Sequence, residues 1–479
     1  MRTTLPRLCA ALLATGLLLT GCAGGFTNDK PRAATAAENP WQIAGSTSST
    51  GPSGPREGAP DSTKTAENGD GGAMDTLALN ALTDVEAFWQ AEWPEHFQGT
   101  FAPVARIVSW DATAPRNRAV EFCGEDTYQF VNAAYCGRDH SIGWDRGILL
   151  PELVKSFDDM AVVMVLAHEY GHAVQGQARM SNRATPTLVQ EQQADCLAGA
   201  FLRHVAEGDS AHFTLNTTDG LNAVLGATVA VRDRDPGDPD NVHGTAFERI
   251  TAVQVGYTDG VPGCKRIDQA EIQARRGSLP VTFEYGEEEG QLPVDRESLA
   301  SMATALGRIM PLPTAPTFDY SGVGRSCAGA APTEPVSYCP DTDTVGSDVA
   351  DLAKRGGPTA GEDAPLSAIV SGDYNAFVAF VSRYALAVQR ARGLELTGAE
   401  SAGLRTACLS GAVTTALSRE GSDPRLSAGD LDEAVSGLLA DGFVASDVEG
   451  EVVPSGFARL EAFRLGVLEG EQSCYRRWA

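Results

Sequence analysis

Residues 166–177, LAHEYGHAVQGQ, contain two histidines four positions apart, His168 and His172, and Glu169 directly follows the first. Residues 158–178 are densely apolar and contain no proline, which predicts a largely buried helix. Positions four apart share one face of a helix, so both imidazoles can bind one Zn²⁺ while the adjacent glutamate serves as a general base. The motif alone is equally compatible with a buried pair of histidines that have only structural partners.

A second predicted helix, residues 188–202, supplies further residues of the types that bind zinc. Glu191 and Asp195 lie four positions apart on one face of it, among leucines and alanines. Burying two carboxylates is costly unless they pair with a cation or bind a metal. We therefore expect Glu191 to be the third zinc ligand and Asp195 to accept the second ring N–H of a ligand histidine. The alternative, a solvated acidic face, fits this apolar segment poorly.

The first 22 residues have the layout of a secretory signal, with a basic start, an apolar run and small residues before Cys22. The ending LTGC resembles a bacterial lipobox, which implies cleavage before Cys22 and lipidation of its thiol; the alternative is an ordinary signal peptide. Residues 23–75 are rich in Gly, Ser, Thr, Pro and Ala, and we expect a disordered linker. The predicted location is the extracellular face of the cell membrane, held there by a lipid anchor.

The rest of the chain, roughly 400 residues, is long for one domain and suits two. We place their boundaries at residues 76–275 and 276–479. The sequence has 63 acidic and 37 basic residues, a formal charge of −26. This charge argues against nucleic acid as a partner and against contact with anionic membrane surfaces other than through the lipid anchor.

The two predicted domains share an internal repeat. Matched cysteines recur in the same order, 203, 212 and 210 residues apart (136 and 339, 196 and 408, 264 and 474). We therefore expect an ancient duplication, with chance similarity of alanine-rich helices as the alternative. The matched segments are YCGRDHSIGWD (135–145) with YCPDTDTVGSD (338–348), ADCLAGA (194–200) with TACLSGA (406–412), and RITAVQVGYTDGVPGC (249–264) with RLEAFRLGVLEGEQSC (459–474).

Eight cysteines remain when Cys9 in the signal and Cys22 are set aside, and an even number in an exported protein predicts four disulfides. Spacing alone does not select the pairing. The repeat narrows the choice because each half contains one close pair and one distant pair. The simplest hypothesis bonds each pair internally, as Cys123–Cys136, Cys196–Cys264, Cys327–Cys339 and Cys408–Cys474.

The second half lacks the residues that could bind zinc through histidine, because all seven histidines precede residue 250. We expect a catalytically inactive copy that packs on the first domain, covers its groove or binds a protein partner. In the alignment, His168, Glu169, His172 and Asp195 correspond to Ser382, Arg383, Leu386 and Ala407.

Four segments in order, YCGRDHSIGWD, AHEYGHAVQ, EQQADCLAG and HGTAFER, resemble motifs of a bacterial family of neutral zinc metallopeptidases. The order H-E-x-x-H and then E-x-x-x-D is also similar to the thermolysin-like class. The resemblance implies an α+β fold, in which a zincin-like metallopeptidase domain precedes a degenerate zincin-like repeat without metal ligands. It also implies an edge strand at residues 140–145 beside the substrate groove.

His243 lies in a predicted loop just before a helix. In related zinc peptidases a histidine in a comparable position hydrogen-bonds the tetrahedral intermediate, so the resemblance implies this role for His243; the alternative is a structural residue at the helix start. Arg249 recurs as Arg459, which favours a structural role for it. The other histidines, which we expect to be superficial or structural, are His96, His140, His204 and His212.

These observations predict a lipid-anchored extracellular zinc endopeptidase with one Zn²⁺ and a peptide or protein substrate. Zinc would activate a water molecule, and Glu169 would take its proton. Two alternatives remain, a non-catalytic metal-binding scaffold and a zinc hydrolase or amidase that acts on the cell envelope. A structural zinc site needs no adjacent base and is normally closed by a fourth protein ligand, and no fourth ligand is evident.

Overall fold

The computed structural model describes residues 42–43, 46–47, 50–233, 243–280, 291–324, 327–419 and 421–478. The expected signal segment and the expected lipidation site, Cys22, lie outside the described residues. Within these ranges no helix combines the length and the apolar character that a membrane crossing needs. The described chain is a mixed α and β structure, as predicted.

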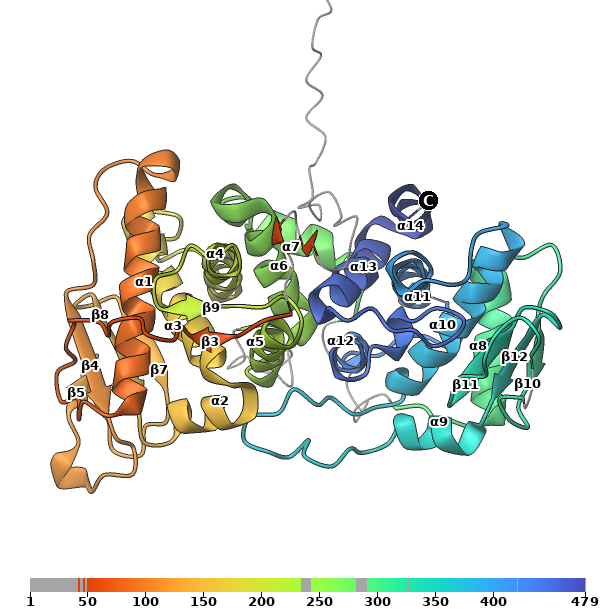
Figure 1. Ribbon diagram of the computed structural model, residues 1–479, viewed down its shortest axis with the longest axis horizontal. Coiled ribbons are helices and arrows are strands. Elements are labelled where there is room, and N and C mark those ends of the chain that lie inside the picture. The colour runs from red at the N-terminus through yellow and green to blue at the C-terminus, as the bar shows by residue number, and fades with distance from the viewer. Residues whose placement is uncertain are drawn as a thin grey trace, which may run out of the picture.

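The first unit places a small sheet at one end and a bundle of helices beside it (Figure 1). Short strands β1 (Gln42–Ile43) and β2 (Ser46–Thr47) pair with each other before it. Its elements are β3 (Gly54–Pro55), α1 (Ala73–His96), β4 (Arg106–Trp110), η1 (Arg116–Arg118), β5 (Glu121–Phe122), β6 (Glu125–Asp126), β7 (Ala133–Cys136), β8 (Ser141–Asp145), α2 (Leu149–Phe157), α3 (Asp159–Ala178), α4 (Thr187–Ala206), β9 (Phe213–Thr214), α5 (Asp219–Ala230), α6 (Ala246–Cys264) and α7 (Gln269–Arg276).

The prediction that the strand at residues 140–145 lies at the edge of the sheet is wrong. The strand that forms there, β8, is the central strand of the order β4-β8-β7, parallel to β4 and antiparallel to β7. All five β8 residues are buried, as is usual for a strand with neighbours on both sides. The outer strand next to α3 is β7, which is therefore the strand that borders the candidate site.

The second unit also combines a three-stranded sheet with helices. Its sheet, β10-β12-β11, again joins a parallel outer strand and an antiparallel outer strand to one central strand. Its elements are α8 (Arg296–Ile309), β10 (Thr317–Asp319), β11 (Val336–Cys339), β12 (Thr344–Ser347), α9 (Val349–Arg355), α10 (Tyr374–Ala391), η2 (Ala399–Gly403), α11 (Leu404–Leu417), α12 (Asp430–Ala440), η3 (Phe443–Ala445), α13 (Gly456–Glu469) and α14 (Glu471–Arg477).

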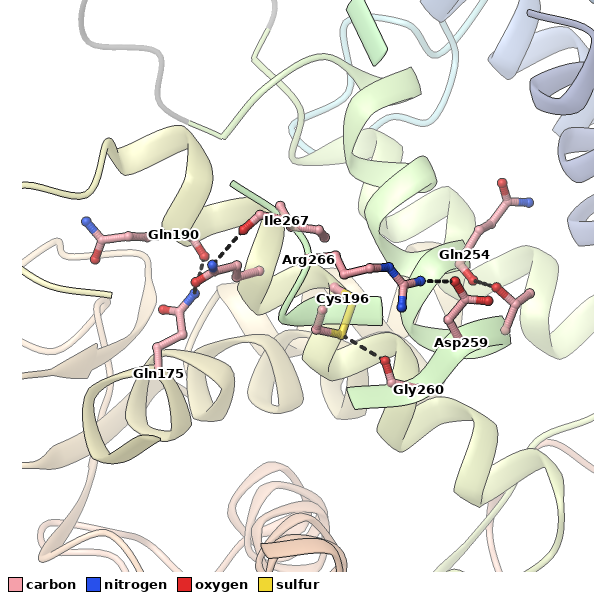
Figure 2. Close-up of a disulfide and its surroundings, with 11 residues drawn as sticks. Gln175, Gln190, Cys196, Gln254, Asp259, Gly260, Arg266 and Ile267 are labelled. Carbon is pink, nitrogen blue, oxygen red and sulfur yellow. Dashed lines mark hydrogen bonds and ion pairs between the residues drawn. A yellow bond between two sulfur atoms is a disulfide. The ribbon is translucent and has the colours of Figure 1, made fainter. Parts of the chain in front are cut away.

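The four disulfides predicted from the repeat are confirmed: Cys123–Cys136, Cys196–Cys264, Cys327–Cys339 and Cys408–Cys474. Figure 2 shows the bond at Cys196, which joins α4 to the end of α6. Sequence separations of 68 and 66 residues make the two distant pairs the larger constraints on the unfolded chain.

The helices joined by the distant disulfides pack with their backbones in contact. A Cβ atom added to Gly256 would lie 1.8 Å from the carbonyl oxygen of Cys196, and one added to Gly466 would lie 1.8 Å from that of Cys408. Only glycine allows so close an approach. The same residue type therefore performs the same packing task in α4–α6 and in α11–α13.

The expected disordered linker does not extend to residue 75, because residues 50–75 contact the first unit. Strand β3 pairs with β9, and Arg56 donates to the backbone carbonyl of Ser210 at 2.9 Å. Asp75 is buried and accepts hydrogen bonds from Ser109 and Trp144 at 2.6 and 2.9 Å. This segment is held by backbone and polar contacts, so a composition poor in apolar residues did not reveal it.

The second unit packs against the first through their helices. The two sheets lie at opposite ends of the molecule, and α5, α6, α12 and α13 meet in the middle (Figure 1). The sequence left three roles open for the second half. This arrangement shows one of them, packing on the first unit.

Candidate zinc site

Three side chains from two helices converge at the predicted zinc site. His168 and His172 project from α3, and Glu191 projects from α4. His168 Nε2 lies 3.2 Å from Glu191 Oε2, and His172 Nε2 lies 3.5 Å from Glu191 Oε1. All three ligand atoms lie within 4.8 Å of one another. The structure thus brings together the three residues that the sequence proposes as ligands.

The other ring nitrogen of each histidine has an acceptor that fixes the ring. His168 Nδ1 lies 2.8 Å from Asp195 Oδ1, as predicted, and His172 Nδ1 lies 3.0 Å from Gln175 Oε1. Gln175 in turn donates to the carbonyl of Gln190 at 2.5 Å (Figure 2). When Nδ1–H donates to these oxygens, Nε2 is the ring atom that faces Glu191, and loss of its proton to an incoming cation would leave the lone pair that a metal-binding histidine requires.

Arg249 completes this network, and the sequence interpretation missed its partner. Its guanidinium group donates to both oxygens of Asp195, at 2.9 and 2.8 Å, and to the carbonyl of Val231 at 2.6 Å. Both Arg249 and Asp195 are buried. A buried arginine needs acceptors for its N–H groups, and a carboxylate is a favourable one, so the segment HGTAFER did contain a signal, but it did not name the partner.

Charges at the site shift the pKa values of its residues. Burial lowers the pKa of His168, but Asp195 and Glu191 outweigh this effect and raise it to about 10. Burial likewise opposes the charged form of Glu191, yet the two imidazoles hold its pKa well below the usual range. The carboxylate is therefore ionised and available as a ligand at neutral pH.

Gly171, between the two histidines, lets α3 and α4 approach closely. A Cβ atom at this position would lie 3.0 Å from the Cα atom and 3.1 Å from the carbonyl oxygen of Ala194 on α4. These are backbone atoms, which cannot rotate away. The small residue therefore brings α4, and with it Glu191, within reach of the histidines.

We expect Gly171→Ala to destabilise the protein by about 1–2 kcal/mol, because the added methyl group overpacks the α3–α4 contact. The matched control is Gly176→Ala on the same helix, where no atom lies within 4 Å of the added carbon. That change should stabilise the helix by about 0.5–1 kcal/mol, since alanine is a better helix former. Thermal unfolding of both variants measures the difference. Equal effects would show that the α3–α4 contact is not tight.

Glu169, the predicted general base, lies at the border between α3 and the sheet. Its Oε2 accepts the backbone N–H of Tyr135 on β7 at 2.9 Å, and its side chain is partly exposed. The carboxylate is thus held beside the outer strand and remains open to solvent.

His243 reaches the edge of the same site. Its Nε2 lies 4.0 Å from Glu191 Oε2, its Nδ1 lies 3.2 Å from Asp233 Oδ1, and its side chain is 46% exposed. Asp233 also accepts the N–H of Gly244 at 2.6 Å, which ties the loop to the start of α6. His243 is not among the three residues whose ligand atoms cluster at the candidate site.

The remaining histidines lie away from these ligands in structural or superficial contacts. His212 is buried against Asp84, His96 contacts Glu92, and His140 contacts the hydroxyl group of Tyr135. His204 stacks near Phe88 and Phe201.

In the second unit, an arginine occupies the position that aligns with Glu169. Arg383 is fully buried, donates to Ser446 Oγ at 2.8 Å and to the carbonyls of Phe443 and Asp447 at 3.1 and 3.3 Å. Burial lowers its pKa to about 9. A cation with these partners cannot act as a base and would repel a metal ion, so this position of the second unit does not reproduce the chemistry of Glu169.

A second group of acidic side chains lies in the second unit, where Asp373, Asp430 and Glu433 place ligand atoms within 4.8 Å of one another. Burial raises their pKa values to about 6, 7 and 9. Glu433 accepts hydrogen bonds from Gln291 at 2.9 Å and from the N–H of Tyr374 at 2.7 Å. Burial thus favours the protonated forms of these carboxyl groups, and neighbouring donors satisfy their oxygens.

The donor set at His168, His172 and Glu191 fits zinc. Two imidazoles and one glutamate are a known ligand set of catalytic zinc sites, with ligand bonds of about 2.0–2.2 Å. Such bonds place two ligand atoms at most about 4.4 Å apart, and the observed 3.2 and 3.5 Å separations satisfy this limit. Magnesium and calcium prefer oxygen ligands and fit less well.

Comparisons of the chain with protein-family models, with curated proteins and with solved structures found no match. An interpretation of the function therefore depends on the sequence motifs and on the geometry of the site.

Proposed function

We propose that the chain is a zinc-dependent peptidase, with a zincin-like first unit that holds one Zn²⁺ and a degenerate second copy of the same fold. The observation that carries the proposal is the convergence of His168, His172 and Glu191, each imidazole fixed by a second partner, and Glu169 follows His168 on the same helix. A purely structural zinc site would need no base and would normally be closed by a fourth protein ligand.

In this account His168, His172 and Glu191 hold the metal ion, which when bound lowers the pKa of a water molecule and polarises the scissile carbonyl. Glu169 accepts the proton of the attacking water and passes it to the leaving amine. The N–H of Tyr135 fixes Oε2 of that carboxylate, and we assign the proton transfer to Oε1. His243 donates a hydrogen bond to the oxyanion that develops.

The substrate in this proposal is an extended peptide that lies along β7. This strand is the outer strand on the α3 side of the sheet, and it also supplies the N–H that holds Glu169. Peptides commonly bind to such strands through main-chain hydrogen bonds.

We also propose that the protein is exported and held at the cell surface by lipidated Cys22. The four disulfides support an oxidising location. The sequence LTGC, which resembles a lipobox and ends at Cys22, also supports this proposal.

The deciding experiment offers an unfolded protein to the zinc-loaded chain and to its Glu169→Gln variant. The proposal expects cleavage by the first and none by the second. Zinc binding by both without cleavage by either would favour a metal-binding scaffold instead.

A further inference from the structure

Two of the polar contacts between the units form a matched pair. Asp432 on α12 of the second unit accepts hydrogen bonds from the backbone N–H groups of Ala246 and Phe247, at 3.0 and 3.1 Å, where α6 begins. Asn222 on α5 of the first unit accepts the backbone N–H of Gly456, at 2.7 Å, where α13 begins. Each unit therefore supplies a side chain that caps a helix of the other unit.

The capping residues and the capped residues are related by one offset. Asn222 and Asp432 are 210 residues apart (222 and 432), as are Ala246 and Gly456 (246 and 456). The same offset relates Cys264 to Cys474. When residue i of one unit meets residue j of the other, and the equivalent of j meets the equivalent of i, the interface is isologous, as in a two-fold symmetric dimer. The two units pack as the protomers of such a dimer would.

The two capping residues differ in charge, and the charged one, Asp432, caps a helix of the first unit. Asp432 is buried, contacts two N–H groups and lies 3.8 Å from the guanidinium group of Arg232. Asn222 is neutral and contacts one N–H group. A carboxylate at a helix N-terminus is favoured by the helix dipole and forms stronger hydrogen bonds than an amide oxygen. The stronger cap thus holds the helix of the unit that contains the candidate site.

The capped turn of α6 leads directly to the site. Arg249, one turn after Ala246, holds both oxygens of Asp195, which in turn contacts Nδ1 of His168. On the other side, His243 lies two residues before Thr245, the N-cap residue of the same helix. A shift of this turn would therefore be transmitted to the partner of a zinc ligand and to the proposed oxyanion donor.

We propose that the second unit is a built-in dimer partner of the first, and that its Asp432 is a positioning residue for the first turn of α6 and for Arg249 and His243. The inference rests on the proposed zinc site, and it assigns a task to a unit that lacks metal ligands. Asp432 acts through the helix and contacts neither the ligands nor the substrate.

The test compares Asp432→Ala with Asn222→Ala in the full chain, two truncations at equivalent places in one interface. Hydrogen exchange is followed in residues 245–249 and 455–459, and zinc affinity is measured by competition with a chelator. We expect Asp432→Ala to accelerate exchange in residues 245–249 by about fivefold, as for a lost helix cap. Its zinc affinity should fall by about threefold to tenfold, less than for loss of a direct ligand partner.

Asn222→Ala should accelerate exchange in residues 455–459 and leave zinc affinity within about twofold of the wild type. Equal zinc affinity in the wild type and Asp432→Ala would overturn the proposal, and so would an equal loss in both variants. Asp432→Asn keeps the shape of the side chain and one acceptor, so we expect smaller changes in exchange rate and zinc affinity. This variant replaces Asp432→Ala if the alanine variant does not fold.

The wild-type measurement separates this inference from the proposed function. If the wild type binds no zinc while Asp432→Ala still accelerates exchange in residues 245–249, the zinc site fails and the contact between units stands. If the wild type binds zinc and Asp432→Ala changes neither readout, the zinc site stands and the positioning role is refuted.

Discussion

Replacing Glu169 by glutamine should abolish peptide hydrolysis and leave the zinc content unchanged. Glutamine has the same shape and can still accept the N–H of Tyr135, so the contact with β7 survives. It cannot take a proton from water, and loss of a general base typically lowers the rate by about 10²–10⁴-fold. Because the base acts in the transition state, kcat should fall while KM changes little.

The matched control for Glu169→Gln is Glu152→Gln, the same change on α2, where Glu152 pairs with Lys155 at 3.0 Å. This variant should retain the activity and the zinc content of the wild type. Steady-state cleavage of a fluorogenic unfolded protein, with metal analysis of the same samples, gives both quantities. Activity of Glu169→Gln within about twofold of the wild type would exclude Glu169 as the base.

Removing the carboxylate of Asp195 should cause the largest loss of stability among changes at the site. Asp195→Ala leaves the guanidinium group of Arg249 buried without its charge partner, which typically costs about 3–5 kcal/mol. It also removes the acceptor of His168 Nδ1, so zinc affinity should fall by about 10–100-fold. Denaturant unfolding without metal and chelator competition measure the two effects separately.

The double variant Asp195→Ala/Arg249→Met distinguishes a buried unpaired charge from a lost ligand partner. Removing the charge as well should restore much of the stability, since the penalty comes from the lone guanidinium group. Zinc affinity should remain low, because His168 still lacks its acceptor. If the single and double variants were equally unstable, the Asp195–Arg249 pair would not explain the loss.

The two helices of the candidate site and the disulfides could be predicted because their signals are local or repeated. H-E-x-x-H and E-x-x-x-D each place side chains on one helical face, and each segment contains an uninterrupted apolar stretch beside its motif. The observed α3 (Asp159–Ala178) and α4 (Thr187–Ala206) agree with the predicted ranges 158–178 and 188–202. The cysteine pairing followed from the order of cysteines that the two halves share.

The contacts that the sequence did not predict join residues far apart along the chain. Arg249 lies 54 residues from Asp195, and Asp432 lies 186 residues from Ala246. Neither spacing reflects a helical or strand period, so no pattern links the partners. The central position of β8 depends on its pairing with β4, which begins 35 residues earlier (106 and 141). Residues 50–75, which are held by backbone and polar hydrogen bonds, likewise have the composition of a linker.

Zinc content with identification of the ligands tests the central claim most directly. Three proteins are compared: the full chain, Glu191→Ala and the control Asp430→Asn in the other acidic cluster. Each is equilibrated with zinc and freed of excess metal. Its metal content is then measured, and the ligands are identified by X-ray absorption. The account predicts one zinc ion in the wild type, bound by two imidazole nitrogens and a carboxylate oxygen, lost in Glu191→Ala and kept in Asp430→Asn. A wild type without zinc, or zinc that survives Glu191→Ala and is lost in Asp430→Asn, would contradict it.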